Sequence, residues 1–271
     1  MSTPTNNLLD YYASIRASGL HARGQVATNK LLALLAIKPG EVVLEIGTGT
    51  GTTLVQTAVK YPQCDLHGLE ISSAMFKATE QRLKLCGVKA VTLHTSFEAL
   101  LPRSMDVVYC ESVLAIQEDE QLEKMVAAIQ RVLKPSGRLV INETIWLDST
   151  STATIRSINQ QCKQAFGIIQ ANATHPYVHN WLALMERYHL RQHVVLKVDA
   201  LMKEKQVPSF HLVLLKSRLY SLLGKLKHYF LPAYRRRYQV FQQSIQHLDT
   251  PEGKTMEGVL CVFQCFLSEG H

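Results

Sequence analysis

The sequence predicts an α/β protein with a doubly wound, seven-stranded, mostly parallel sheet and an α-helical lid. Three observations lead to this fold class. A β-branched apolar run at residues 42–46 precedes three glycines at every second position and then a helix-forming stretch. Further short apolar runs follow along the chain, interleaved with stretches of helical periodicity, which is the order expected of strands joined by crossover helices. Residues 201–255 break this alternation with helical patterns alone.

The turn after the first strand, Glu45-Ile46-Gly47-Thr48-Gly49-Thr50-Gly51, is the first signal of function. Glycine permits unusual backbone dihedrals and lets a ligand approach the main chain closely. Free N–H groups at the start of the following helix face the same space. A dinucleotide fingerprint would place its third glycine at position 52, which is a threonine. The pattern acid-x-Gly-x-Gly-x-Gly instead resembles the class I S-adenosylmethionine-dependent methyltransferases, which have a Rossmann-like fold.

In that family the glycine turn holds the methionine end of the cofactor, S-adenosyl-L-methionine. The resemblance therefore implies that the turn binds this cofactor through Glu45, Gly47, Thr48, Gly49 and Gly51.

A second strand is predicted at residues 64–69, and Glu70 follows it, 23 residues after Gly47. An acid about 20 residues beyond the glycine turn, at the tip of the neighbouring strand, suits a bidentate bond to ribose hydroxyls. The resemblance implies this role for Glu70 and places Ile71 near the adenine. The alternative for Glu70 is an ordinary solvated glutamate. Ser72 is a suitable N-cap for a helix over 74–86.

The third and fourth strands are predicted at residues 90–94 and 105–110. Members of the family often carry an Asp after the third strand that binds the adenine amino group. Ser96 stands there in this chain, which is a departure from the pattern, and Phe97 is expected to cover the ring. Glu111 ends the fourth strand at the edge where open α/β sheets bind ligands, so we expect it to contact the cofactor.

A periodic helix with acids in its first turn precedes the phrase Leu-Lys-Pro-x-Gly-Arg-Leu and a fifth strand at residues 138–144. That phrase also resembles the family. Strands at 193–199 and 257–266 follow, and in relatives the last strand runs antiparallel between the fifth and the sixth. The predicted organisation has four parts: a cofactor-binding core with N-terminal helices (1–148), a helical lid segment (149–177), the rest of the core sheet (178–200 and 256–271) and a basic helical insertion (201–255).

No motif identifies a catalytic residue. Transfer of a methyl group from a sulfonium is an in-line displacement, in which the protein supplies proximity, alignment and a water-poor pocket. A base is needed only where the acceptor must lose a proton. The candidates are Glu143, at the cofactor edge of the fifth strand, and His175 and His179, between lid and core; a purely structural role is the alternative for each.

The amino-acid composition limits the kinds of protein that this sequence can encode. The net charge is +7, and residues 203–237 hold nine Lys/Arg and one acid, so the basic surplus sits in that segment. No apolar run reaches membrane-spanning length, and the first residues lack a signal-peptide pattern. The six cysteines form no C-x-x-C pair, so we expect no metal site and free thiols in a cytoplasmic protein.

The chain most resembles the branch that includes quinone-biosynthesis and natural-product methyltransferases, which implies a small, apolar or amphipathic acceptor. Two alternatives stay open: a nucleic-acid methyltransferase that grips phosphates with the basic insertion, and a non-catalytic cofactor-binding module. Residues 110–113 lack the Asn/Asp-Pro-Pro-aromatic motif of base amino-methylases, which argues against nucleic acid. The insertion either packs its leucine stripe on the core, or roofs the pocket while its cations meet an anionic membrane or an acidic substrate group. The oligomeric state stays open.

Overall fold

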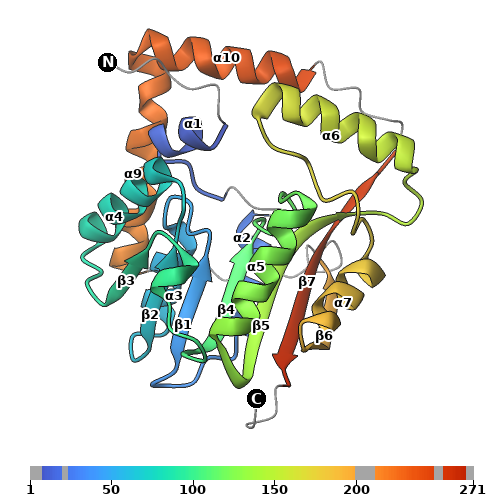
Figure 1. Cartoon of the computed structure of the whole chain (residues 1–271). Helices are drawn as coiled ribbons and strands as arrows, with labels where there is room; N and C mark the ends of the chain where they lie inside the picture. Colours follow the sequence, from blue (N-terminus) through green and yellow to red (C-terminus); the bar gives the residue numbers. More distant parts are fainter. Residues whose placement is uncertain (1–7, 20–23, 199–210, 247–252, 267–271) are drawn as a thin grey trace.

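The computed structural model describes residues 8–19, 24–198, 211–246 and 253–266. Within them a seven-stranded sheet has the order β3-β2-β1-β4-β5-β7-β6 (Figure 1). Strand β7 is antiparallel to β5 and β6, and the other paired strands are parallel. The predicted fold class and the predicted place of the last strand are therefore confirmed. The strands are β1 (Val42–Ile46), β2 (Asp65–Leu69), β3 (Val91–His94), β4 (Met105–Glu111), β5 (Leu133–Trp146), β6 (Leu190–Lys197) and β7 (Met256–Cys265).

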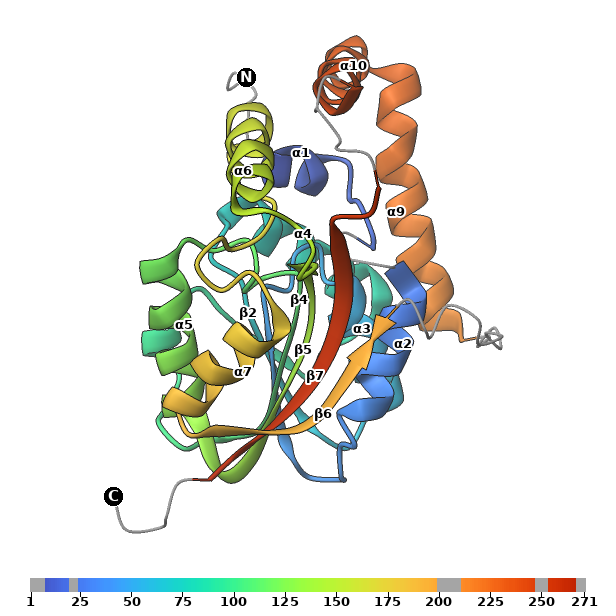
Figure 2. The same ribbon diagram turned by 90° about the vertical axis from the view of Figure 1, so that its right-hand side faces the viewer.

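Helices cover both faces of the sheet, with α2 and α3 on one side and α5 and α7 on the other (Figure 2). Helices α1, α6 and α10 lie beyond the ends of the strands that carry the glycine turn (Figure 1). The helices are α1 (Leu8–Ser14), α2 (Gly24–Leu34), α3 (Thr52–Lys60), α4 (Ser73–Cys86), α5 (Asp119–Val132), α6 (Thr152–Phe166), α7 (Val178–Arg187), α9 (Leu212–Phe230) and α10 (Pro232–Gln246), with a 3-10 turn at Phe97–Ala99.

The central strands are buried on both faces, which explains their nearly continuous apolar sequences. Val43 on β1 packs in the cluster beneath α2, whereas its neighbour Leu44 packs in the cluster beneath α5. The α5 stripe predicted from helical spacing, including Leu122 and Val126, is fully buried against that second face. Ser72 caps α4 as expected, its Oγ accepting a hydrogen bond from the Met75 N–H at 3.3 Å.

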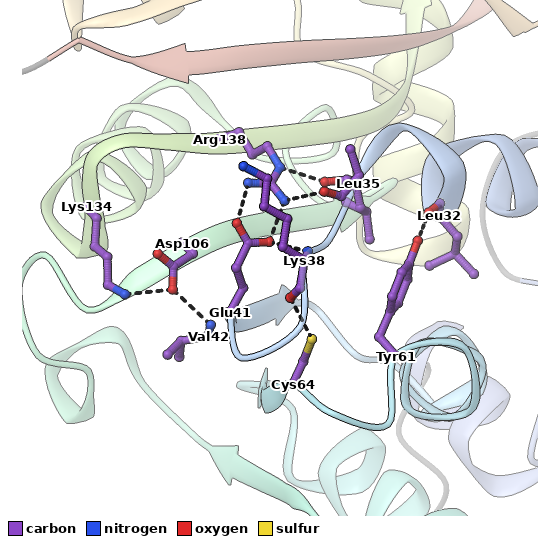
Figure 3. A network of polar contacts seen from close by, with 11 residues as sticks. Leu32, Leu35, Lys38, Glu41, Val42, Tyr61, Cys64, Asp106, Lys134 and Arg138 are labelled. Carbon is purple, nitrogen blue, oxygen red and sulfur yellow. Dashed lines mark hydrogen bonds and ion pairs between the residues drawn. The ribbon is translucent and has the colours of Figure 1, made fainter.

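The Leu-Lys-Pro-x-Gly-Arg-Leu motif stabilises the end of the sheet that lies opposite the glycine turn (Figure 3). Arg138 donates to both carboxylate oxygens of Glu41, at 2.9 and 2.6 Å, and to the Leu35 carbonyl at 2.6 Å. The Arg138 bond is the main reason that the pKa of Glu41 is lowered. Asp106 accepts from Lys134 Nζ at 2.6 Å and from the Val42 N–H. This part of the family pattern therefore ties α2, β1, β4 and β5 together at a distance from the ligand edge.

The described part of the insertion contains helices α9 and α10, and α9 packs on α3 and α4. Of the two alternatives for the insertion, the one in which the leucine stripe packs on the core is wrong for most of the stripe, since Leu219, Leu222 and Leu223 are exposed. The buried face of α9 is instead made of Ser217, Tyr220, Ser221 and Gly224. A Cβ on Gly224 would lie 2.0 Å from the Ile15 carbonyl oxygen, so only glycine permits this close approach. None of the helices in the described ranges is long and apolar enough to span a membrane.

Candidate cofactor and acceptor site

A cavity of about 740 Å³ opens where β1, β2, β4 and β5 end, with α1, α6 and α10 above it. The strand order reverses between β1 and β4, and such a switch point is where open α/β sheets bind ligands. The predicted cofactor residues that line the cavity are Glu45, Gly47, Thr48, Gly49, Glu70, Ile71, Phe97 and Glu111. The wall does not include Gly51 or Ser96.

The three glycines of the turn all have positive φ, at 70°, 56° and 78°, but for different reasons. A Cβ on Gly47 would lie 2.5 Å from a Val113 methyl, and one on Gly51 would lie 3.0 Å from a Thr79 methyl. A Cβ on Gly49 would meet no described atom within 4 Å. Packing therefore requires Gly47 and Gly51, whereas Gly49 presents bare backbone to the open cavity, as a closely bound cofactor needs.

Glu70 is fixed at the cavity wall beside this backbone. Its carboxylate accepts hydrogen bonds from the Gly49 N–H at 2.8 Å and the Ser72 N–H at 2.9 Å. Burial raises the pKa of Glu70, and these backbone bonds oppose the rise. Each carboxylate oxygen has a second lone pair, so both can still accept a ribose hydroxyl. Ile71, 74% exposed, and Phe97 line the same cavity, where an adenine ring would fit between apolar side chains.

Two more acidic side chains, Glu45 and Glu111, form the floor of the cavity. Glu45 accepts from the Tyr109 hydroxyl at 2.8 Å, and its pKa is raised well above its usual range by burial and by the nearby Glu111 and Glu70. Glu111 accepts hydrogen bonds from three polar side chains on α2, α3 and β5, namely Thr28, Thr53 and Asn142. The raised pKa favours the neutral form of Glu45, and a bound cation such as a sulfonium would favour its ionised form.

The three catalytic candidates are not brought together. Glu143 lines the cavity but is fully buried, and its carboxylate accepts the N–H groups of Val113, Leu114 and Ala115 at 3.0, 3.0 and 3.2 Å. Burial raises its pKa to about 7. Neither His175 nor His179 lines the cavity. Glu143 therefore holds the loop after β4 in place, and no described contact assigns a catalytic role to either histidine.

The roof was not predicted residue by residue. It consists of aromatic and uncharged polar side chains from α1, α6 and α10, among them Tyr11, Tyr12, Phe166, Tyr238 and Gln242. The adjacent tyrosines within a short amphipathic helix were the available signal in the sequence. No Lys, Arg or His belongs to the lining among the described residues, and no cluster of His, Cys, Asp or Glu there could hold a metal ion.

Comparison with known proteins agrees with this geometry. Residues 43–137 match the family model described as a methyltransferase domain. The matched stretch runs from β1 into β5 and so includes the glycine turn, Glu70 and Glu111. This part of the chain is therefore a methyltransferase domain, similar to the domains of S-adenosylmethionine-dependent methyltransferases.

Curated relatives of this methyltransferase domain act on different acceptors. A malonyl-[acyl-carrier protein] O-methyltransferase of Marinomonas is 30% identical over 57% of this chain and 53% of its own length. A ubiquinone/menaquinone biosynthesis C-methyltransferase of Syntrophotalea carbinolica is 30% identical over 46% of this chain and 52% of its own length. The chain thus spans about half the length of these relatives.

A solved structure shares the fold over nearly the whole chain. The Haemonchus contortus phosphoethanolamine N-methyltransferase 2, in complex with phosphomonomethylethanolamine and S-adenosylhomocysteine, aligns with a TM-score of 0.67. The alignment covers 96% of this chain and 57% of that one at 16% identity. At this identity the likeness supports the fold alone.

Proposed function

We propose that this protein transfers a methyl group from S-adenosyl-L-methionine to a small, apolar or amphipathic acceptor bound beneath α1, α6 and α10. One observation carries the proposal: Glu70 and the bare backbone of Gly49 meet at a cavity of about 740 Å³ whose remaining walls are mainly apolar and aromatic. That volume lies within the range of pockets that bury a small molecule.

The acidic side chains of the site bind the cofactor, and the aromatic side chains above them exclude water. The cofactor, when bound, supplies an electrophilic methyl group. Glu70 would accept the ribose hydroxyls, and Glu111, held by hydrogen bonds from Thr28, Thr53 and Asn142, would offer an acidic side chain to the sulfonium end of the cofactor. The aromatic roof, including Tyr12 and Phe166, keeps water out and aligns the acceptor. The lining assigns the proton-accepting role to no residue, which fits an acceptor that needs little help in deprotonation.

The charge of the lining argues against a phosphorylated acceptor. Phosphate groups in proteins are usually paired with Arg or Lys. The described lining holds four acidic side chains and no basic one. An anionic acceptor such as the phosphomonomethylethanolamine of the Haemonchus structure would find no basic partner among the described lining residues, so we propose an acceptor without a phosphate.

The test is a methyl-transfer assay that measures S-adenosylhomocysteine release with matched acceptors. An uncharged prenylated hydroquinone is compared with a prenyl diphosphate of the same chain length, and the Glu70→Ala variant is the negative control. We expect turnover of the uncharged acceptor alone. Methylation of the diphosphate alone would contradict the acceptor class, and failure of the wild type to bind S-adenosylhomocysteine in calorimetry would contradict the cofactor assignment.

We also propose that the protein works in the reducing cytoplasm, at an anionic membrane where an amphipathic acceptor would partition. Six free, buried cysteines and the basic segment support this setting. Nucleic acid is the alternative use of the cations. A filter-binding assay at two salt concentrations tests it, because phosphate contacts give a steep loss of affinity with salt.

A further inference from the structure

The outer face of α9 carries an apolar stripe that is open to solvent. At 3.6 residues per turn its members fall within an arc of about 100°. They are Leu212 (66% exposed), Leu215 (51%), Leu219 (49%), Leu222 (54%), Leu223 (45%) and Phe230 (76%). An amphipathic helix of a globular protein normally turns such a stripe towards the core. Here the stripe points away from it.

The orientation of α9 is fixed by its opposite face. Arg82 of α4 is fully buried, and its guanidinium donates to the Ser217 Oγ at 2.9 Å and the Ser221 Oγ at 3.0 Å. The same guanidinium donates to the Thr50 carbonyl of the glycine turn at 2.5 Å. Gly224 lies against the Ile15 carbonyl, where no larger residue fits. The helix therefore cannot rotate its leucines inward without breaking buried hydrogen bonds.

Cations border the stripe on both sides. By the same helical spacing, Lys216 lies next to one edge and Arg218 and Lys225 lie next to the other. Helices α9 and α10 together contain seven Lys/Arg and no acid. Figure 2 shows α9 along the outer side of the molecule, leading to α10. The surface is thus apolar along its centre and positive at its margins.

We propose that this face of α9 binds the surface of an anionic lipid bilayer. Leucines along the centre enter the interface between headgroups and acyl chains, and the flanking cations contact lipid phosphates, as in other interfacial amphipathic helices. Nucleic acid would engage the cations but leave the leucines in water. A second copy of the chain would cover the leucines but bring like charges together. A bilayer with anionic lipids satisfies both parts of the surface at once.

The inference rests on the surface of α9 and requires no methyl transfer, so the two proposals can fail separately. The experiment is co-sedimentation of the full chain, at low salt, with vesicles of phosphatidylcholine alone or mixed with phosphatidylglycerol. We expect binding to the mixed vesicles. Replacing Leu219, Leu222 and Leu223 together by Ser should weaken it at least about tenfold, because the apolar part of the binding is lost.

A second variant removes the charges, with Lys216, Arg218 and Lys225 each replaced by Gln. It should also weaken binding at least about tenfold. Leu101→Ser is the matched control, because Leu101 is 74% exposed and lies outside α9, in the segment that precedes β4. It should bind like the wild type. All three variants should keep wild-type affinity for S-adenosylhomocysteine, which shows that they are folded.

Two results would overturn the proposal. One is a wild-type protein that ignores the mixed vesicles, or a leucine variant that binds them as well as the wild type does. The other is a wild-type dimer in gel filtration that the leucine variant converts to a monomer without any vesicle binding, since the stripe would then be an interface between two copies.

Discussion

Replacing Glu143 by Gln separates a positioning role from a catalytic one. The carboxylate accepts three backbone N–H bonds from residues 113–115, two of them on one oxygen. Gln keeps a carbonyl oxygen for the Val113 and Leu114 N–H groups but turns an amide N–H₂ towards the Ala115 N–H. One buried donor then loses its acceptor, which costs about 1–3 kcal/mol. For a chain of this size we expect the melting temperature to fall by about 2–10 °C.

The loss of stability in Glu143→Gln depends on pH, and burial of the carboxyl group decides whether the loss grows or shrinks as pH rises. The pKa of Glu143 is raised from 4.5 to about 7, so the folded state holds this proton where the unfolded state has released it. Stability contributed by the wild-type carboxyl is present below pH 4.5 and declines as pH rises to about 7. Gln does not titrate. The gap between wild type and Glu143→Gln should therefore be widest below pH 4.5 and narrower at pH 8.

The measurements are melting curves at several pH values, S-adenosylhomocysteine affinity by calorimetry, and kcat with a working acceptor. Because Val113 and Ala115 line the cavity, we expect a several-fold loss of cofactor affinity along with the loss of stability. A general base would behave differently, with kcat reduced about 10²–10⁴-fold. That reduction, with melting temperature and affinity both unchanged, would refute the positioning role.

Four further predictions concern the walls of the site and the packing of α9. Glu70→Ala should weaken S-adenosylhomocysteine binding about tenfold or more, since a hydrogen bond to a charged acceptor contributes about 1.5–3 kcal/mol; unchanged affinity in calorimetry would disprove the ribose assignment. Wild-type affinity should also rise with pH through the raised pKa of Glu70, because the ionised carboxylate is the better acceptor. Gly47→Ala should lower the melting temperature more than Gly49→Ala does, because only the former places a Cβ 2.5 Å from a Val113 methyl, whereas Gly49→Ala should mainly weaken cofactor binding; equal melting temperatures would contradict this. Gly224→Leu should destabilise the protein by at least about 1–3 kcal/mol in denaturant unfolding, because the site has no room for a side chain.

Much of the cofactor side could be predicted from the sequence because its signals are local. One short stretch contains the apolar run of β1, the spaced glycines and the start of the next helix. The requirement for positive φ is a property of the turn itself. Glu70 could be located because a parallel strand after a crossover helix ends at the same sheet edge. The structure places Glu70 within 2.8 Å of the Gly49 N–H, as that topology implies.

The sequence by itself thus determined the doubly wound sheet, the glycine turn and the acid beside it. Only the tertiary structure decided which polar side chains remain available to bind a ligand. The carboxyl group of Glu143, for example, already accepts hydrogen bonds from N–H groups of a loop 28–30 residues away in the sequence. The tertiary structure also decided the direction of the α9 leucines. Helical periodicity shows that a stripe exists but not which way it faces, and here the buried guanidinium of Arg82 and the close contact at Gly224 turn the small, polar side of the helix inward.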